Sequence, residues 1–156
     1  MKKIQKETKS FYTMYVANDG TEFHSEEECK KYEESAKGVV SARYRELIVR
    51  KDVEENILGF GCSDDTVEIV MVKTEADYDT VLQMKLLIEP YLTEEQYAGN
   101  LDIAKKKIRR ALDEQDVLIV NRGCCCGDIF WLMGTRNSFK ESIDKFCDAE
   151  KQVDNA

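Results

Sequence analysis

The sequence predicts an α+β fold, in which a small N-terminal ββα unit packs with a mainly antiparallel sheet and its helices. Two short aromatic or β-branched runs flank the turn signal Asn18-Asp19-Gly20, and a capped helical pattern follows them. Further along the chain, apolar β-branched runs alternate with segments whose apolar residues recur at helical spacing. No repeat or long linker separates these patterns, so we expect one compact entity with two parts, a ββα unit at 11–38 and an α+β body at 39–156.

The ββα unit is predicted from its turn and capping residues. We expect a strand within 11–17, a returning strand at 21–23 and a helix that begins after Ser25. The Ser25 hydroxyl and Glu28, at the third helical position, form a capping-box pattern, and an acidic first turn suits the positive end of the helix dipole. Gly38 is expected to end this helix in the left-handed conformation.

The spacing of this unit is similar to that of a Cys2His2 zinc finger. Gly20, Phe23 and Tyr32 occupy the glycine and core positions of such a finger, but its four metal ligands are absent. We therefore expect aromatic packing by Tyr15, Phe23 and Tyr32 in place of a metal. The approximate ligand positions hold other residues: Val16, Asp19, Tyr32 and Ala36.

The body is predicted to be built around buried strands. Residues 39–60 begin with a pattern that fits either a helix or a strand, and both alternatives stay open. The nearly continuous apolar run at 66–73 is typical of a central strand covered on both faces. Thr74 then caps a helix that ends just before Pro90, because the residue preceding a proline disfavours helical backbone.

A second long helix is expected after Pro90. Thr93 opens another capping-box pattern, and apolar residues recur at helical intervals from there to Glu114. Gly99-Asn100 is the point where we expect this helix to divide in two.

The C-terminal part is predicted to be a hairpin and a helix. We expect strands at 117–120 and 129–133 around a turn at 121–123. Ser138, with Glu141 three positions later, is expected to cap the last helix.

Composition and charge limit the possible functions. The 156 residues are 42% hydrophobic and 35% charged, and 31 acidic against 23 basic residues give a net charge of -8. A general affinity for the nucleic-acid backbone is not expected, because binding phosphates needs concentrated Lys and Arg. No apolar run approaches the ~20 residues of a membrane span, so we expect a cytoplasmic protein with no membrane contact. In that compartment its cysteines stay reduced.

The N-terminal segment also carries a family resemblance. The run from Tyr15 to Glu33 matches the pattern Y-x-A-x-D-G-x-x-F-x-S/T-x-E-E-C-x-x-Y/H-E. This pattern resembles the opening of small uncharacterised proteins encoded by phages and mobile elements. The likeness covers about residues 11–34 and is loose beyond them. It implies a setting, a phage or mobile element inside a host cell, rather than a reaction.

The candidates for chemistry are sparse. Cys124 and Cys126 would share one face of a strand and are the alternative site for a metal or a redox pair, but the sequence offers no second pair of ligands with metal-site spacing. His24, the one histidine, is expected on the surface. Carboxylate pairs at Asp64-Asp65 and Asp77/Asp79 are best explained as loop and helix-start residues. No cofactor is expected.

Two function classes follow. The first is a non-enzymatic protein that binds and inhibits a host protein by covering a basic surface with its acidic one. The host protein could be a nucleic-acid-binding nuclease, and the protein would then act as an anti-CRISPR protein does. Its expected contact residues lie on the first helix: Glu26, Glu27, Glu28, Glu33 and Glu34. The second class is a small thiol- or metal-dependent module at Cys124 and Cys126, with a structural or assembly factor as a further alternative.

The basic run from Lys105 to Arg110 is expected to be a solvated helix face. The weaker hypothesis is that this run docks an acidic partner or RNA. The sequence leaves the oligomeric state open.

Overall fold

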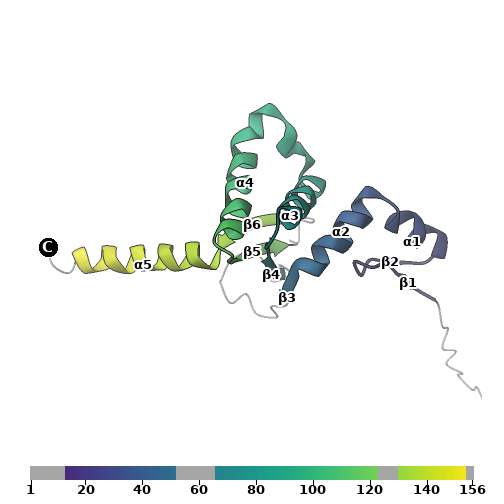
Figure 1. Cartoon of the computed structure of the whole chain (residues 1–156), viewed down its shortest axis with the longest axis horizontal. Coiled ribbons are helices and arrows are strands. Elements are labelled where there is room, and N and C mark those ends of the chain that lie inside the picture. The colour runs from purple at the N-terminus through teal and green to yellow at the C-terminus, as the bar shows by residue number, and fades with distance from the viewer. Residues whose placement is uncertain (1–12, 52–65, 123–129, 154–156) are drawn as a thin grey trace, which may run out of the picture. The chain divides into compact units, whose positions relative to one another are not determined.

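The computed structural model describes residues 13–51, 66–122 and 130–153. Over these residues the chain forms five α-helices and two antiparallel sheets, which confirms the predicted α+β class (Figure 1). The chain divides into two compact units, Met1–Val39 and Val40–Ala156, and the division falls inside a helix.

The first unit begins with a short hairpin. Strand β1 (Tyr15–Val16) pairs antiparallel with β2 (Glu22–Phe23), and the turn between them includes Gly20 at a φ of 86°. Both strands are shorter than predicted. Helix α1 (Glu26–Glu33) follows, and the Ser25 side chain accepts a hydrogen bond from the Glu28 amide, so the predicted N-cap is confirmed.

The prediction for Gly38 is wrong. Helix α1 ends at Glu33, and Gly38 lies in the first turn of α2 (Ala36–Leu47). The Ser35 hydroxyl donates to the Tyr32 carbonyl at 2.5 Å and accepts from the Gly38 amide at 3.0 Å, so it caps α2. A Cβ at Gly38 would lie 2.1 Å from the Tyr32 carbonyl oxygen. Gly38 is therefore required by a close approach of backbone rather than by a left-handed conformation.

The second unit contains a four-stranded antiparallel sheet of order β3-β4-β5-β6. Its strands are β3 (Ile48–Lys51), β4 (Thr66–Met71), β5 (Val117–Arg122) and β6 (Phe130–Thr135). Strand β4 is central, as predicted. The two alternatives for the start of 39–60 are both partly realised, because α2 continues to Leu47 and β3 follows it directly.

The sequence predicted the turn after β5 too early, at 121–123. Asn121 and Arg122 are still in β5 and pair with Val67 and Thr66 of β4. Both polar side chains sit on a strand because the sheet supplies backbone partners on either side, which outweighs their preference for turns.

Two helices connect β4 to β5. Helix α3 (Glu75–Ile88) has a full capping box between Thr74 and Asp77 and ends before Pro90, as predicted. Two 3-10 turns (Pro90–Thr93 and Glu95–Tyr97) then precede α4 (Ala98–Asp113). Figure 1 shows α3 and α4 side by side, and the two helices are in contact.

The expected cap and break of α4 are wrong. The Thr93 hydroxyl donates to the Pro90 carbonyl and stabilises a 3-10 turn instead of capping an α-helix. Helix α4 runs without interruption through Gly99 and Asn100. A glycine in an exposed first turn costs only about 1 kcal/mol relative to alanine, which the buried face of this helix outweighs.

The core of the second unit lies between α3, α4, the end of α2 and the sheet. The fully buried side chains include Tyr44, Val81, Ile108 and Leu118. The remaining core members are apolar residues from the same elements: Val40, Val70, Val72, Met84, Ala104, Ala111, Leu112, Val120 and Leu132.

Helix α5 (Arg136–Val153) follows β6, and its cap differs from the prediction. Thr135 accepts the Ser138 amide at 3.1 Å, so Ser138 is inside the helix and donates to the Thr135 carbonyl. The buried Asp116 accepts the Asn137 amide at 2.7 Å and forms an ion pair with Arg136. A short polar residue at the end of β6 and a buried carboxylate together start this helix.

None of the helices in the described ranges is long and apolar enough to cross a membrane.

Candidate functional site

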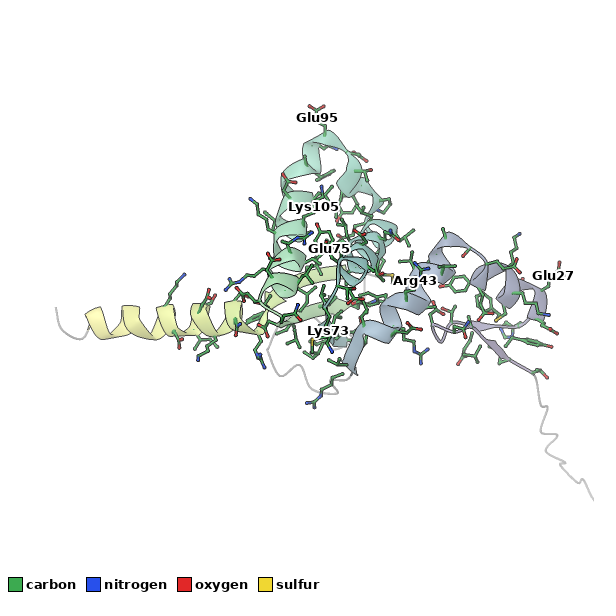
Figure 2. All side chains as sticks on the ribbon, viewed as in Figure 1. Glu27, Arg43, Lys73, Glu75, Glu95 and Lys105 are labelled. Atoms are coloured by element: carbon green, nitrogen blue, oxygen red, sulfur yellow. The ribbon has the colours of Figure 1, made fainter. Side chains whose placement is uncertain are left out.

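The outer face of α1 carries the exposed carboxylates that the sequence singled out. Glu26, Glu27, Glu28 and Glu34 are exposed, and Figure 2 shows Glu27 pointing away from the helix. A shallow hollow on this surface is lined entirely by charged side chains, three carboxylates and two ammonium groups: Glu26, Glu27, Glu34, Lys30 and Lys31. The face is therefore of mixed charge with an acidic excess.

Glu33 has a different environment from the other four glutamates. It is half-buried, and its Oε1 accepts a hydrogen bond from the Asn18 amide at 2.9 Å. This bond joins α1 to the hairpin turn. Glu33 thus supports the scaffold, and four carboxylates are left to face a partner.

Glu26 already has an intramolecular partner. The Lys30 ammonium lies 2.6 Å from its Oε1, and this hydrogen bond and charge lower the pKa of Glu26. Both side chains are more than half exposed, so the pair contributes little to stability and a stronger cationic partner can replace it.

A hydrogen bond and an aromatic pair hold α1 on its hairpin. The Tyr32 hydroxyl donates to Oδ2 of Asp19 at 2.6 Å, and the Tyr32 ring lies 5.2 Å from the Phe23 ring. Tyr15 is opposite Phe23 in the hairpin register. Burial raises the pKa of Asp19, but hydrogen bonds from Tyr32 and Thr21 outweigh it, and the net pKa is lowered.

The hairpin and α1 have a high density of negative charge. Residues 13–39 contain seven acidic and three basic side chains, a net charge of -4 from 27 of the 156 residues. The preceding twelve residues contain four lysines and one glutamate, a net charge of +3. The remaining residues 40–156 carry the other 23 acidic and 16 basic side chains, a net charge of -7. The hairpin and α1 thus hold more negative charge per residue than the rest of the chain, and they are next in sequence to a basic segment.

The thiol alternative falls largely outside the described residues, since Cys124 and Cys126 lie there. Cys29 is buried in α1, and burial followed by the nearby carboxylates of Glu33 and Asp19 raises the pKa of its thiol. A raised pKa makes Cys29 a poor nucleophile. Among the residues that the structure describes, no three His, Cys, Asp or Glu side chains are grouped as metal ligands.

Two arginines of the basic run on α4 join this helix to its neighbours. Arg109 forms a bidentate pair with Glu75 of α3 at 2.6 and 2.9 Å and lies 4.3 Å from the centre of the Tyr78 ring. Arg110 binds Glu114 and Glu141, the second of which belongs to α5. These contacts pair the two arginines with carboxylates of the protein itself, so neither arginine offers an unpaired charge to an acidic partner.

Among the remaining candidates, Asp77 has a structural role, and Asp79 is exposed on α3. Asp77 caps α3 by accepting the Lys73 and Thr74 amides, each at 2.9 Å. His24 is exposed, as predicted. Asp64-Asp65 lies outside the described residues.

Sequence reasoning missed a hollow of about 260 Å³ between the end of α3, the first 3-10 turn and α4. Its lining includes three charged residues, Lys85, Glu89 and Lys107, two of which are buried. Lys85 and Glu89 are four positions apart, which in a sequence indicates an ordinary surface ion pair. Only the folded chain shows that both are buried and line this hollow.

No protein-family model matches this chain, and the comparisons with curated proteins and with solved structures also gave no match.

Proposed function

We propose that this protein is a non-enzymatic binding protein that inhibits a host protein by covering a basic surface with the exposed carboxylates of α1. One observation carries the proposal. Glu26, Glu27 and Glu28 of α1, and Glu34 directly after it, are exposed, and α1 is fixed to its hairpin by hydrogen bonds from the Asn18 backbone amide to Glu33 and from Tyr32 to Asp19. Carboxylates on a fixed helix lose less entropy on binding than carboxylates on a mobile chain.

The resemblance of residues 15–33 to phage and mobile-element proteins supplies the biological setting for this proposal. In that setting, a nucleic-acid-binding nuclease of host defence is the partner class that we favour, as for an anti-CRISPR protein. Such a nuclease needs a positively charged channel for the phosphate backbone. Exposed carboxylates on one helix offer that channel a competing anionic surface.

Binding of this kind should depend on salt. Exposed charges are screened over about 8 Å at physiological ionic strength and over about 3 Å at 1 M salt. We expect added salt to lower the association rate more than it raises the dissociation rate, because long-range attraction acts mainly on the encounter of the two proteins.

The test is capture from host lysate followed by assay of the captured protein. Tagged protein would be used at about 50 mM and about 500 mM salt, and retained proteins identified by mass spectrometry. The purified partner's activity would then be measured with the full chain present. We expect a basic partner that is retained at low salt, released at high salt and inhibited on binding.

Two charge-reversal pairs make the test specific. Glu27→Lys with Glu28→Lys alters the α1 face, whereas Glu94→Lys with Glu95→Lys makes the same charge change at the turn before α4, where Figure 2 shows Glu95 pointing outward. The α1 pair should lose both capture and inhibition, and the control pair should keep them. Equal retention by both pairs, with the circular dichroism spectrum unchanged, would reject the α1 face.

Metal and thiol analysis of the purified chain tests the competing class. Stoichiometric zinc that is lost in a Cys124→Ser, Cys126→Ser variant would favour the metal-dependent alternative over the binding protein.

A further inference from the structure

The hollow between α3 and α4 combines buried charges with an apolar wall. Three charged residues line it: Lys85, Glu89 and Lys107. The rest of the lining is formed by the aliphatic residues Leu92, Ile103, Ala104 and Leu132, with Tyr91 and Asn100 as polar side chains. Such a combination is typical of small-molecule sites, which are mostly apolar and hold a few placed polar groups.

The first charged pair in the hollow is deeply buried. Lys85 and Glu89 are each 7% exposed, and the Lys85 ammonium donates to Oε2 of Glu89. The Tyr91 hydroxyl also hydrogen-bonds to Glu89, and burial together with that carboxylate raises the pKa of Tyr91. The charge of Glu89 is thus shared between Lys85 and Tyr91.

Lys107 is the second cation of the hollow. Its ammonium donates to the Leu132 carbonyl of β6 at 2.8 Å, and it is half-buried. Burial, followed by the like charge of Lys85, lowers the pKa of Lys107. Lys85 and Lys107 both line the hollow, and Glu89 is the one carboxylate among its described lining residues, so these residues carry an excess of one positive charge.

We propose that this hollow binds a small organic monoanion, a carboxylate with an apolar body, whose carboxylate pairs with Lys107 and whose body lies against Ile103, Ala104 and Leu132. An anion at this position balances the second ammonium and relieves its repulsion from Lys85. After its bond to the Leu132 carbonyl, the Lys107 ammonium retains two N–H donors for the ligand. Asn100 and Tyr91 supply further polar atoms at the wall.

The size of the hollow sets the size of the ligand. A volume of about 260 Å³ suits a single aromatic ring or a branched aliphatic chain with one carboxylate, not a nucleotide. Tyr91 stands at its wall with its ring centre 5.1 Å from that of Tyr97 and an interplanar angle of 70°. An aromatic ligand would extend this edge-to-face pair, an arrangement that aromatic rings favour.

Phenylacetate, phenylacetamide and acetate separate the contributions of charge and apolar body. The full chain would be titrated with each in turn while the backbone amides of Leu92, Ile103 and Ala104 are followed by NMR. For phenylacetate we expect saturable shifts with a Kd on the order of 1 mM, consistent with ten non-hydrogen atoms. Phenylacetamide lacks the charge and acetate lacks the body, so each should bind at least about tenfold more weakly.

Lys107→Met is the decisive variant, and Lys106→Met is its matched control on the exposed side of the same helix. The Lys107 change should abolish the preference for phenylacetate over phenylacetamide, and the Lys106 change should leave it intact. If Lys107→Met does not fold, Ile103→Glu replaces it, because Ile103 is 54% exposed and a carboxylate there would repel the ligand. Equal binding of all three ligands, or no saturable shift with any of them, would overturn the proposal.

Discussion

The Tyr32 hydroxyl donates a 2.6 Å hydrogen bond to the Asp19 carboxylate, between two positions at which a Cys2His2 finger would place metal ligands. One residue comes from the hairpin turn and the other from α1, so the bond joins the same two elements that zinc joins in a finger. A hydrogen bond is much weaker than a metal site, and Phe23 adds apolar contact to it.

Removing this hydroxyl should loosen the first unit. Tyr32→Phe keeps the ring against Phe23 but loses a charge-assisted hydrogen bond, which at a half-exposed site is worth about 1 kcal/mol. Amide hydrogen exchange in the hairpin and α1 should quicken by about fivefold, because 1.4 kcal/mol corresponds to tenfold. Tyr15→Phe is the control, and added chelator should not change the exchange of the parent protein.

The first unit should also lose stability in acid. The pKa of Asp19 is lowered below its ordinary value of 3.8, so the folded unit binds the Asp19 proton less readily than the unfolded chain. The contribution is therefore present in full above about pH 4 and is lost as the pH falls through the folded pKa. A carboxyl NMR titration should show the lowered pKa of Asp19 and its rise in Tyr32→Phe. An unchanged pKa in that variant would mean that the hydroxyl is not the cause.

Alkaline pH should destabilise the second unit through Tyr44. Its hydroxyl donates to Glu68 at 2.9 Å inside the core, and burial, followed by the Glu68 charge, raises the pKa of Tyr44 well above 10.0. Above pH 10 the unfolded chain releases the proton while the folded chain keeps it. The free energy of unfolding should then fall by up to about 1.4 kcal/mol per pH unit. Urea melts of Tyr44→Phe, compared with the parent between pH 9 and 11, should lack this component of the slope.

Two glycine substitutions should have opposite effects. Gly134 has a φ of 147°, and a Cβ there would lie 2.6 Å from Oγ of Ser138, so Gly134→Ala should cost about 1–3 kcal/mol. A Cβ at Gly99 would meet nothing within 4 Å, so Gly99→Ala in α4 should stabilise by about 0.5–1 kcal/mol. Thermal melts of both variants measure the contrast, and destabilisation by Gly99→Ala would contradict the helical assignment of that turn.

The core of the second unit should be most sensitive at Ile108. This side chain is fully buried in the face that α4 turns toward the core. Ile108→Ala should lower the free energy of unfolding by about 2–5 kcal/mol because it leaves a cavity. Ile103→Ala, on the same helix but 54% exposed, is the control and should cost much less.

Local signals in the sequence predicted what depends on local chemistry. The Ser25 and Thr74 caps, the end of α3 before Pro90 and the central position of β4 follow from neighbouring residue types, and all are confirmed. Of the five glutamates expected to face a partner, Glu26, Glu27, Glu28 and Glu34 are exposed, as charged side chains usually are, whereas Glu33 is half-buried.

The sequence could not show features that depend on tertiary contacts. Thr135, not Ser138, caps α5 because β6 ends there beside the buried Asp116, which is distant in sequence. In the sequence Glu33 cannot be distinguished from its exposed neighbours, and only the fold shows that the Asn18 backbone amide donates to its carboxylate. Lys85 and Glu89 have the spacing of a surface pair, yet both are buried in the folded chain.

Gly38 and the exposed glutamates of α1 differ in how well they should tolerate substitution. Any side chain at that position would collide with the Tyr32 backbone. Among the glutamates at α1, Glu33 bonds to the hairpin turn, whereas the other four are exposed. Mutations that retune a binding face would therefore accumulate on Glu26, Glu27, Glu28 and Glu34 without loss of structure. A protein in competition with a changing partner would gain from that division, since α1 can vary its charges while the glycine in the first turn of α2 stays fixed.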